Sequence, residues 1–154
     1  MASWSEIERQ APELAARATG FLEGRVHRTI ATLRRDGSPR ITGTELRFDH
    51  GELWFGSMWR SNKALDLLRD PRFSLHSGSE DPPGWKGDAT VSGTVEEADA
   101  AEIERIFGQA PPGKSHLFRA DITEVTLVTL ADSGDHLVIE SWTPSRGVTS
   151  RKRY

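Results

Sequence analysis

Alternation of apolar and polar residues along several short segments is the feature that most constrains the fold of this chain. Residues 88–97 place an apolar or small side chain at every second position, which is typical of a half-buried β-strand. Other segments with strand character are 29–33, 40–48, 53–55, 72–77, 117–130 and 136–142. The sequence therefore predicts a mainly β protein, in which six or seven antiparallel strands form a barrel with flanking helices.

Helical spacing replaces this alternation in a few places. Ser3 has the pattern of a helix cap and apolar residues then recur at helical spacing, so residues 1–23 are predicted to be an N-terminal helical segment. A second apolar stripe predicts a helix over residues 98–108. The barrel is expected over residues 24–142, and a polar, basic tail over residues 143–154.

The composition excludes several classes of function. The chain has 154 residues and a net charge of −3, which is not the basic excess that electrostatic binding to nucleic acid or an anionic membrane requires. It has no cysteine, so thiol catalysis and thiolate metal sites are excluded. The five histidines lack metal-ligand spacing such as HExxH, so no metal site is predicted. No apolar run approaches the ~20 residues that span a bilayer. With no secretory signal in the sequence, a cytoplasmic protein is expected.

The segment 51–71 (GELWFGSMWRSNKALDLLRDP) is the strongest candidate for a binding site. It predicts a strand, a polar loop and a helix that ends at Asp70-Pro71. The loop concentrates hydroxyl, amide and cationic side chains: Ser57, Arg60, Ser61, Asn62 and Lys63. A helix N-terminus has free N–H groups and a partial positive charge, so these side chains suit a phosphate cradle in which Lys63 is partly exposed. An ordinary capped helix with solvated cations is the alternative.

Residues 31–77 contain an ordered set of motifs: ATLRRDGSPR, a hairpin, and SNKALDLLRDPR before the next strand. Together with the later GDATVSGTVEE strand and the helix after it, this set resembles the pyridoxamine 5′-phosphate oxidase-like family of split β-barrels. The resemblance extends over roughly residues 20–142. It implies a six- to seven-stranded antiparallel split barrel of the FMN-binding type. It also implies a homodimer that holds a flavin-type cofactor in two clefts between the subunits, and the low apolar content of 36% agrees with a partner subunit.

The resemblance also implies which residues contact the cofactor. In the family, the loop that matches residues 57–63 grips the cofactor phosphate, and the strand that matches residues 42–47 lies along the ring system and the ribityl chain. The implied cofactor-binding set is Thr42, Thr44, Ser57, Arg60, Ser61, Asn62 and Lys63. Thr42 stands nearest the basic residue with which this strand starts in the pyridoxamine phosphate oxidases. The C-terminal signature with which the pyridoxamine phosphate oxidases bind their substrate is not recognisable in SWTPSRGVTSRKRY. Their substrate is therefore not carried over to this chain.

FMN is the expected cofactor, and the deazaflavin F420, used by another branch of the family, is the alternative. Haem, which some members bind, is less favoured. The acidic tail of F420 would suit additional cations, for which the candidates beyond the loop are Lys86, Arg146, Arg151, Lys152 and Arg153. The expected function is an oxidoreductase that transfers hydride to or from a small organic substrate, and the alternative is a non-catalytic cofactor- or haem-binding protein. The sequence contains no legible nucleophile–base pair, so no catalytic residue is predicted.

The sequence leaves the roles of a few side chains open. Pairing of Glu45 with Arg47 or another base across the sheet is favoured over a place in the cleft. His76 would serve as a haem ligand or proton donor only if it faced a cleft. The tryptophans that could flank a planar ligand, or pack in the core or the dimer interface, are Trp59, Trp85 and Trp142.

Overall fold

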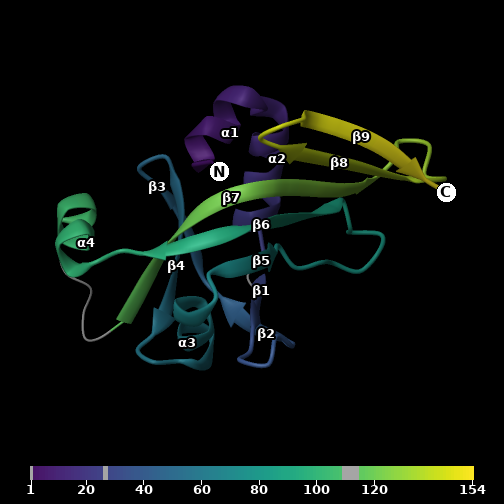
Figure 1. Ribbon diagram of the computed structural model, residues 1–154. Helices are drawn as coiled ribbons and strands as arrows, with labels where there is room; N and C mark the ends of the chain where they lie inside the picture. The colour runs from purple at the N-terminus through teal and green to yellow at the C-terminus, as the bar shows by residue number, and fades with distance from the viewer. Residues whose placement is uncertain (1, 26–27, 109–114) are drawn as a thin grey trace.

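The computed structural model describes residues 2–25, 28–108 and 115–154 (Figure 1). In this part of the chain the helices are α1 (Trp4–Gln10), α2 (Pro12–Glu23), α3 (Asn62–Arg69) and α4 (Ala100–Phe107). The strands are β1 (Arg28–Leu33), β2 (Pro39–Thr44), β3 (Leu46–Asp49), β4 (Glu52–Met58), β5 (Arg72–His76), β6 (Gly87–Glu97), β7 (Ser115–Leu130), β8 (Leu137–Thr143) and β9 (Gly147–Arg153). None of the helices in these ranges is long and apolar enough to cross a membrane.

The strands form one antiparallel sheet, which confirms the mainly β fold with flanking helices. The strand order is β2-β1-β5-β6-β7-β4-β3, and β8 and β9 are added beside β7. Only Glu45 separates β2 from β3 along the chain, although these strands stand at opposite ends of that order. The two ends of the sheet therefore lie together, so the sheet is rolled up. The predicted single strand over residues 40–48 is in fact these two strands.

A bulge in the long central pair helps the sheet to bend. The β6–β7 register shifts between Ser92 and Gly93. A Cβ atom at Gly93 would lie 2.1 Å from the carbonyl oxygen of Asp121. Only glycine allows this close backbone approach, and a bulge of this kind increases the local twist of a strand.

The polar, basic end of the chain forms a strand that was not predicted. Residues 147–153 form β9, which pairs with β8 in a register that runs from Thr143 opposite Gly147 to Leu137 opposite Arg153. Six of the seven residues of β9 are exposed. An exposed strand has no apolar face, so the alternation that revealed the other strands is missing here. This strand, and the division of residues 40–48, raise the count from the predicted six or seven strands to nine.

The N-terminal helices lie against the rolled sheet (Figure 1), and their buried side chains pack with apolar residues of the strands. The predicted cap is present, because Ser3 Oγ accepts the N–H of Glu6 and the Glu6 carboxylate accepts the N–H of Ser3. Trp4, Ile7 and Leu22 are at most 2% exposed and belong to the main core with residues of the central strands. A second, smaller cluster of Trp54, Ala98 and Ile103 attaches α4 at the other side of the sheet.

Candidate functional site

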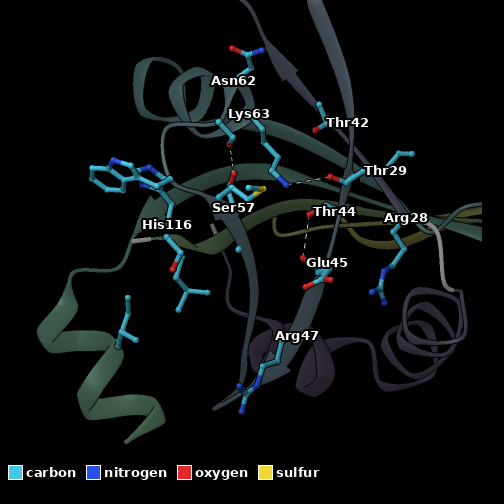
Figure 2. Close-up of a pocket in the computed structure, with 18 of the residues that line it drawn as sticks. Arg28, Thr29, Thr42, Thr44, Glu45, Arg47, Ser57, Asn62, Lys63 and His116 are labelled. Atoms are coloured by element: carbon cyan, nitrogen blue, oxygen red, sulfur yellow. Dashed lines mark hydrogen bonds between the residues drawn. The ribbon is translucent and has the colours of Figure 1, made fainter. Parts of the chain in front are cut away.

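A cleft of about 1250 Å³ opens between the end of β2, the end of β4, the start of α3, helix α4 and the start of β7 (Figure 2). The residues that line it are Arg28, Thr29, Thr42, Gly43, Thr44, Glu45, Arg47, Gly56, Ser57, Met58, Trp59, Ser61, Asn62, Lys63, Ile103, Phe107, Ser115, His116 and Leu117. The fold thus brings six of the seven predicted cofactor-binding residues into one cleft. Arg60 is the seventh, and it is not among the described residues of the lining.

Two hydroxyl groups meet where β4 leads into α3. Ser61 is the N-cap of α3, and its Oγ accepts the N–H of Ala64 at 3.2 Å. The Oγ atoms of Ser57 and Ser61 lie 2.5 Å apart. The first N–H groups of a helix have no carbonyl partner within it and carry a partial positive charge. The cleft therefore has donors for an anion at this corner. The amide of Asn62, another residue of the predicted set, points away from Lys63 (Figure 2).

Lys63 is buried, which corrects the prediction of a partly exposed side chain. It is 9% exposed because its chain runs under the start of α3 toward β2, where Nζ donates to the carbonyl of Gly43 at 3.3 Å (Figure 2). Burial lowers the pKa of Lys63, and the nearby Glu45 carboxylate partly opposes that shift. An ammonium group has three donors. One is directed to Gly43, so two remain for a ligand in the cleft.

The hydroxyl of Thr42 is a buried polar group without a partner. Its Oγ1 is inaccessible to solvent and makes no hydrogen bond within the described chain, and the same holds for Nε of Arg28 in the cleft lining. Thr44 Oγ1 donates to the carbonyl of Glu45 at 3.2 Å. Buried polar atoms are nearly always hydrogen-bonded in native proteins. An unsatisfied hydroxyl in a cleft therefore fits a site that a polar ligand completes.

His116 and Trp59 form one wall of the cleft. The imidazole is 4% exposed, and its ring lies 4.7 Å from that of Trp59 at an interplanar angle of 7°. Its Nδ1 lies 2.5 Å from Oε1 of Glu97, and its Nε2 accepts the N–H of Arg60 at 3.2 Å. Sequence reasoning missed His116, because only the β4–β7 register brings it opposite Ser57.

Helix α4 supplies an apolar wall that the sequence analysis also missed. Ile103, Phe107 and the neighbouring Leu117 line the cleft. The guanidinium of Arg47 lies over the Phe107 ring at 4.6 Å from its centroid. The apolar stripe of residues 98–108 was visible in the sequence, but not the fact that part of it faces a cleft.

The ion pairs of the folded chain differ from those expected around Glu45. Arg47 forms its ion pair with Asp49 rather than with Glu45. Glu45 is exposed at the cleft, and no ion pair within the described residues includes it. Arg40 Nε lies 2.7 Å from Oδ2 of Asp66, so this cation is engaged away from the cleft.

Other candidates from the sequence lie elsewhere. Trp142 is fully buried in the core, and Trp85 donates its Nε1–H to Asp88 at 3.0 Å. His76 is outside the lining, and its Nδ1 accepts the N–H of Gly78. Among the described residues, the lining also contains neither Lys86 nor any residue from 143 onward. His27 lies outside the described residues, and so do residues 110–113, which follow the predicted helix over 98–108.

The site thus combines hydrogen-bond donors at the start of α3 with an apolar wall, on a rolled antiparallel sheet. Comparison with known proteins identifies the family. The chain belongs to the pyridoxamine 5′-phosphate oxidase family, whose model matches residues 14–129. The fold is accordingly the split barrel of that family. A search of curated proteins found no match to this chain.

Solved structures with the same fold differ in what they bind. A pyridoxamine 5′-phosphate oxidase-related, FMN-binding protein from Nostoc punctiforme PCC 73102 is 16% identical over 90% of this chain and 94% of its own, with a TM-score of 0.60. A structure described as an F420 reductase is 18% identical over 70% of this chain and 94% of its own, with a TM-score of 0.53. A heme-binding protein from Mycobacterium smegmatis is 14% identical over 99% of this chain and 88% of its own, with a TM-score of 0.55. Identities this low establish the fold alone.

Proposed function

We propose that the protein is an oxidoreductase that binds FMN in this cleft and exchanges hydride between FMN and a small organic substrate. The observation that carries the proposal is the unsatisfied, buried hydroxyl of Thr42 in the same cleft as the Ser57–Ser61 pair and Lys63. Family membership supports the choice of cofactor class. Binding of FMN to the purified protein would support the proposal most directly.

The roles of the chain's own residues follow from their chemistry. Ser57, Ser61 and Lys63 would hold the phosphate, because hydroxyl and ammonium donors at a helix N-terminus suit an anion. Thr42 and Thr44 would contact the uncharged part of the cofactor from β2. The charge on Lys63 offsets the phosphate charge at a site where water is partly excluded, which strengthens the attraction.

FMN, when bound, supplies the electron and hydride chemistry, and the protein supplies position and electrostatics. The wall made by Ile103, Phe107 and Leu117 would exclude water and orient an apolar part of the substrate. No acid or base among the lining residues is assigned a proton-transfer role.

F420 is the second candidate cofactor, since Arg28 and Arg47 add two cations to the lining that would suit its longer acidic tail, although Arg47 would have to share its charge with its partner Asp49. Haem is less favoured. His116 is the one histidine among the described lining residues, and both of its ring nitrogens are already engaged. An iron ligand would need one of them free.

A homodimer is part of the same proposal. Met58, which lines the cleft at the end of β4, is 82% exposed, and Ile41, which precedes the lining residue Thr42 on β2, is 72% exposed. A second subunit would cover them and complete the site. Sedimentation at micromolar concentration should give a dimer, and a stable monomer would contradict the two-cleft arrangement.

Titration with FMN, F420 and haem, followed by fluorescence and absorption, tests the cofactor. FMN should bind with its yellow absorption bands retained, whereas a single band at shorter wavelength would indicate F420 and a Soret band haem. Turnover of bound cofactor with a reductant and small acceptors then separates an enzyme from a binding protein. Failure to bind any of the three would refute the proposal.

A further inference from the structure

A strained turn leads from β4 into α3. Arg60 has a φ of 54°, in the left-handed region that residues other than glycine, asparagine and aspartate seldom adopt. The turn is closed by the N–H of Ser61, which donates to the carbonyl of Met58 at 3.1 Å. Such backbone strain persists only where surrounding contacts over-determine the conformation. Other groups must therefore hold Arg60 in this conformation.

His116 provides the contact to this turn from the neighbouring strand. Its Nε2 accepts the N–H of Arg60 at 3.2 Å, and its ring stacks on Trp59. His116 lies opposite Ser57 in the β4–β7 register, so the sheet fixes its position. A buried side chain on a regular strand thus supports two consecutive residues of the strained turn.

Glu97 determines which nitrogen of His116 carries the proton. Its carboxylate can only accept a hydrogen bond, and Oε1 lies 2.5 Å from Nδ1. The proton is therefore on Nδ1 in the neutral ring, and Nε2 has a lone pair for the N–H of Arg60. The two bonds require each other, because the opposite tautomer would direct two N–H groups at one another.

We infer that Glu97 and His116 act as a positioning pair for the turn of residues 58–61 and, through it, for the Ser57–Ser61 hydroxyls. Ser61 follows Arg60 directly, caps α3 and contacts Ser57. Relaxation at Arg60 would therefore displace a hydroxyl of the phosphate corner. The effect on cofactor affinity rests on the proposed function, whereas the support of the turn does not.

FMN titration of three variants tests the effect on affinity. His116→Ala should weaken FMN binding about tenfold, as expected for loss of one hydrogen bond with some relaxation. His116→Gln should return to within about threefold of the parent, because its amide also carries an acceptor oxygen and a donor NH2 group. His76→Ala is the matched control, since His76 also accepts a backbone N–H, at 3.0 Å, but lies outside the cleft. Equal affinity of His116→Ala and the parent would overturn the inference.

Nitrogen NMR of the parent protein without cofactor gives a test that needs no variant to fold. The neutral ring of His116 should carry its proton on Nδ1, and the amide of Arg60 should be protected from hydrogen exchange. The Nε2–H tautomer, or an unprotected Arg60 amide, would refute the positioning role. If the NMR result holds but the parent binds no FMN, the proposed function fails and the support of the turn stands.

Discussion

Lys63 and the cations of β9 both stand in polar segments of the sequence, but they differ in burial in the folded chain. Lys63 at the start of α3 is buried, and burial lowers its pKa. Arg151, Lys152 and Arg153 on β9 are exposed. β8, to which β9 pairs, meets β7 only from Val125 onward, while the cleft lies at Ser115–Leu117. At about 3.3 Å per residue, that separation is on the order of 30 Å.

A cation becomes a candidate phosphate ligand when it is desolvated and lies close to other donors, and the number of neighbouring charges does not decide this. A buried ammonium group interacts strongly with an anion because water does not screen it. Cations on an exposed edge strand are screened, and they also discourage pairing of that edge with another chain.

The largest expected effect is on stability, at the buried carboxylate of the helix that carries Lys63. Asp66 on α3 is 3% exposed and accepts hydrogen bonds from Thr32, Arg40 and Arg69. Asp66→Ala should lower the free energy of unfolding by about 2–3 kcal/mol, because the buried Thr32 hydroxyl and two partly exposed guanidinium groups lose their acceptor. Denaturant unfolding measures this. Asp70→Ala is the matched control, since its pair with Arg72 is at the surface and should contribute less.

The same group gives the stability a pH dependence. Burial alone would raise the pKa of Asp66, but hydrogen bonds from Arg40, Thr32 and Arg69 outweigh it and lower the pKa. A carboxyl whose pKa is lower in the folded state stabilises the fold above its ordinary pKa and loses that effect as the pH falls. The parent should therefore lose stability below about pH 4 more steeply than Asp66→Asn. Parallel acid-unfolding curves would contradict this.

The next effect in size is alkaline loss of FMN affinity. Burial lowers the pKa of Lys63, so the free protein should lose this proton at a lower pH than an exposed lysine does. FMN binding should weaken by roughly tenfold as the neutral form takes over. Titrations over a rising pH series measure it, and the dependence should vanish in Lys63→Ala. An unchanged dependence in that variant would assign the effect to another group.

A smaller effect is expected at the hydroxyl pair. Ser57→Ala should weaken FMN binding by about fivefold, since one neutral hydrogen bond contributes ~1 kcal/mol. Ser74→Ala is a suitable control, because Ser74 also faces another serine across strands, at 2.9 Å from Ser92. An effect of Ser57→Ala as large as that of Lys63→Ala would mean that the hydroxyl, not the charge, dominates.

The smallest effect is predicted for the exposed side of the comparison. The double variant Arg151→Ala, Lys152→Ala should bind FMN within about twofold of the parent, because distant exposed charges are screened. A loss of tenfold or more would bring β9 into the site through a partner subunit. That result would erase the distinction between the two groups of cations.

Much of the fold was predictable because its signals are local. Alternation revealed the buried strands, and the Ser3–Glu6 capping box revealed α1. The loop composition around Ser57 and Ser61 singled out residues that line the cleft. β9 was not predictable, because an exposed strand has no apolar face. The placing of His116 was not predictable either, since it depends on pairing between strands more than fifty residues apart.

The remaining misses also arise from long-range packing. Burial of Lys63 follows from the contact of α3 with β2, which no local pattern encodes. Arg40 stands only two residues before Thr42 in the chain, but its pair with Asp66, which no local pattern encodes, holds it away from the cleft. The sequence indicates which side chains are present near a motif, whereas tertiary structure decides which of them are desolvated.

The central claim is that the corner formed by Lys63, Ser57 and Ser61 binds the cofactor phosphate. The most direct test compares FMN with riboflavin, which lacks the phosphate, in the parent and in Lys63→Ala. The parent should prefer FMN, and Lys63→Ala should reduce that preference by about ten- to a hundredfold, with riboflavin affinity little changed. A preference for FMN that survives intact in Lys63→Ala, or equal binding of both ligands by the parent, would contradict the account.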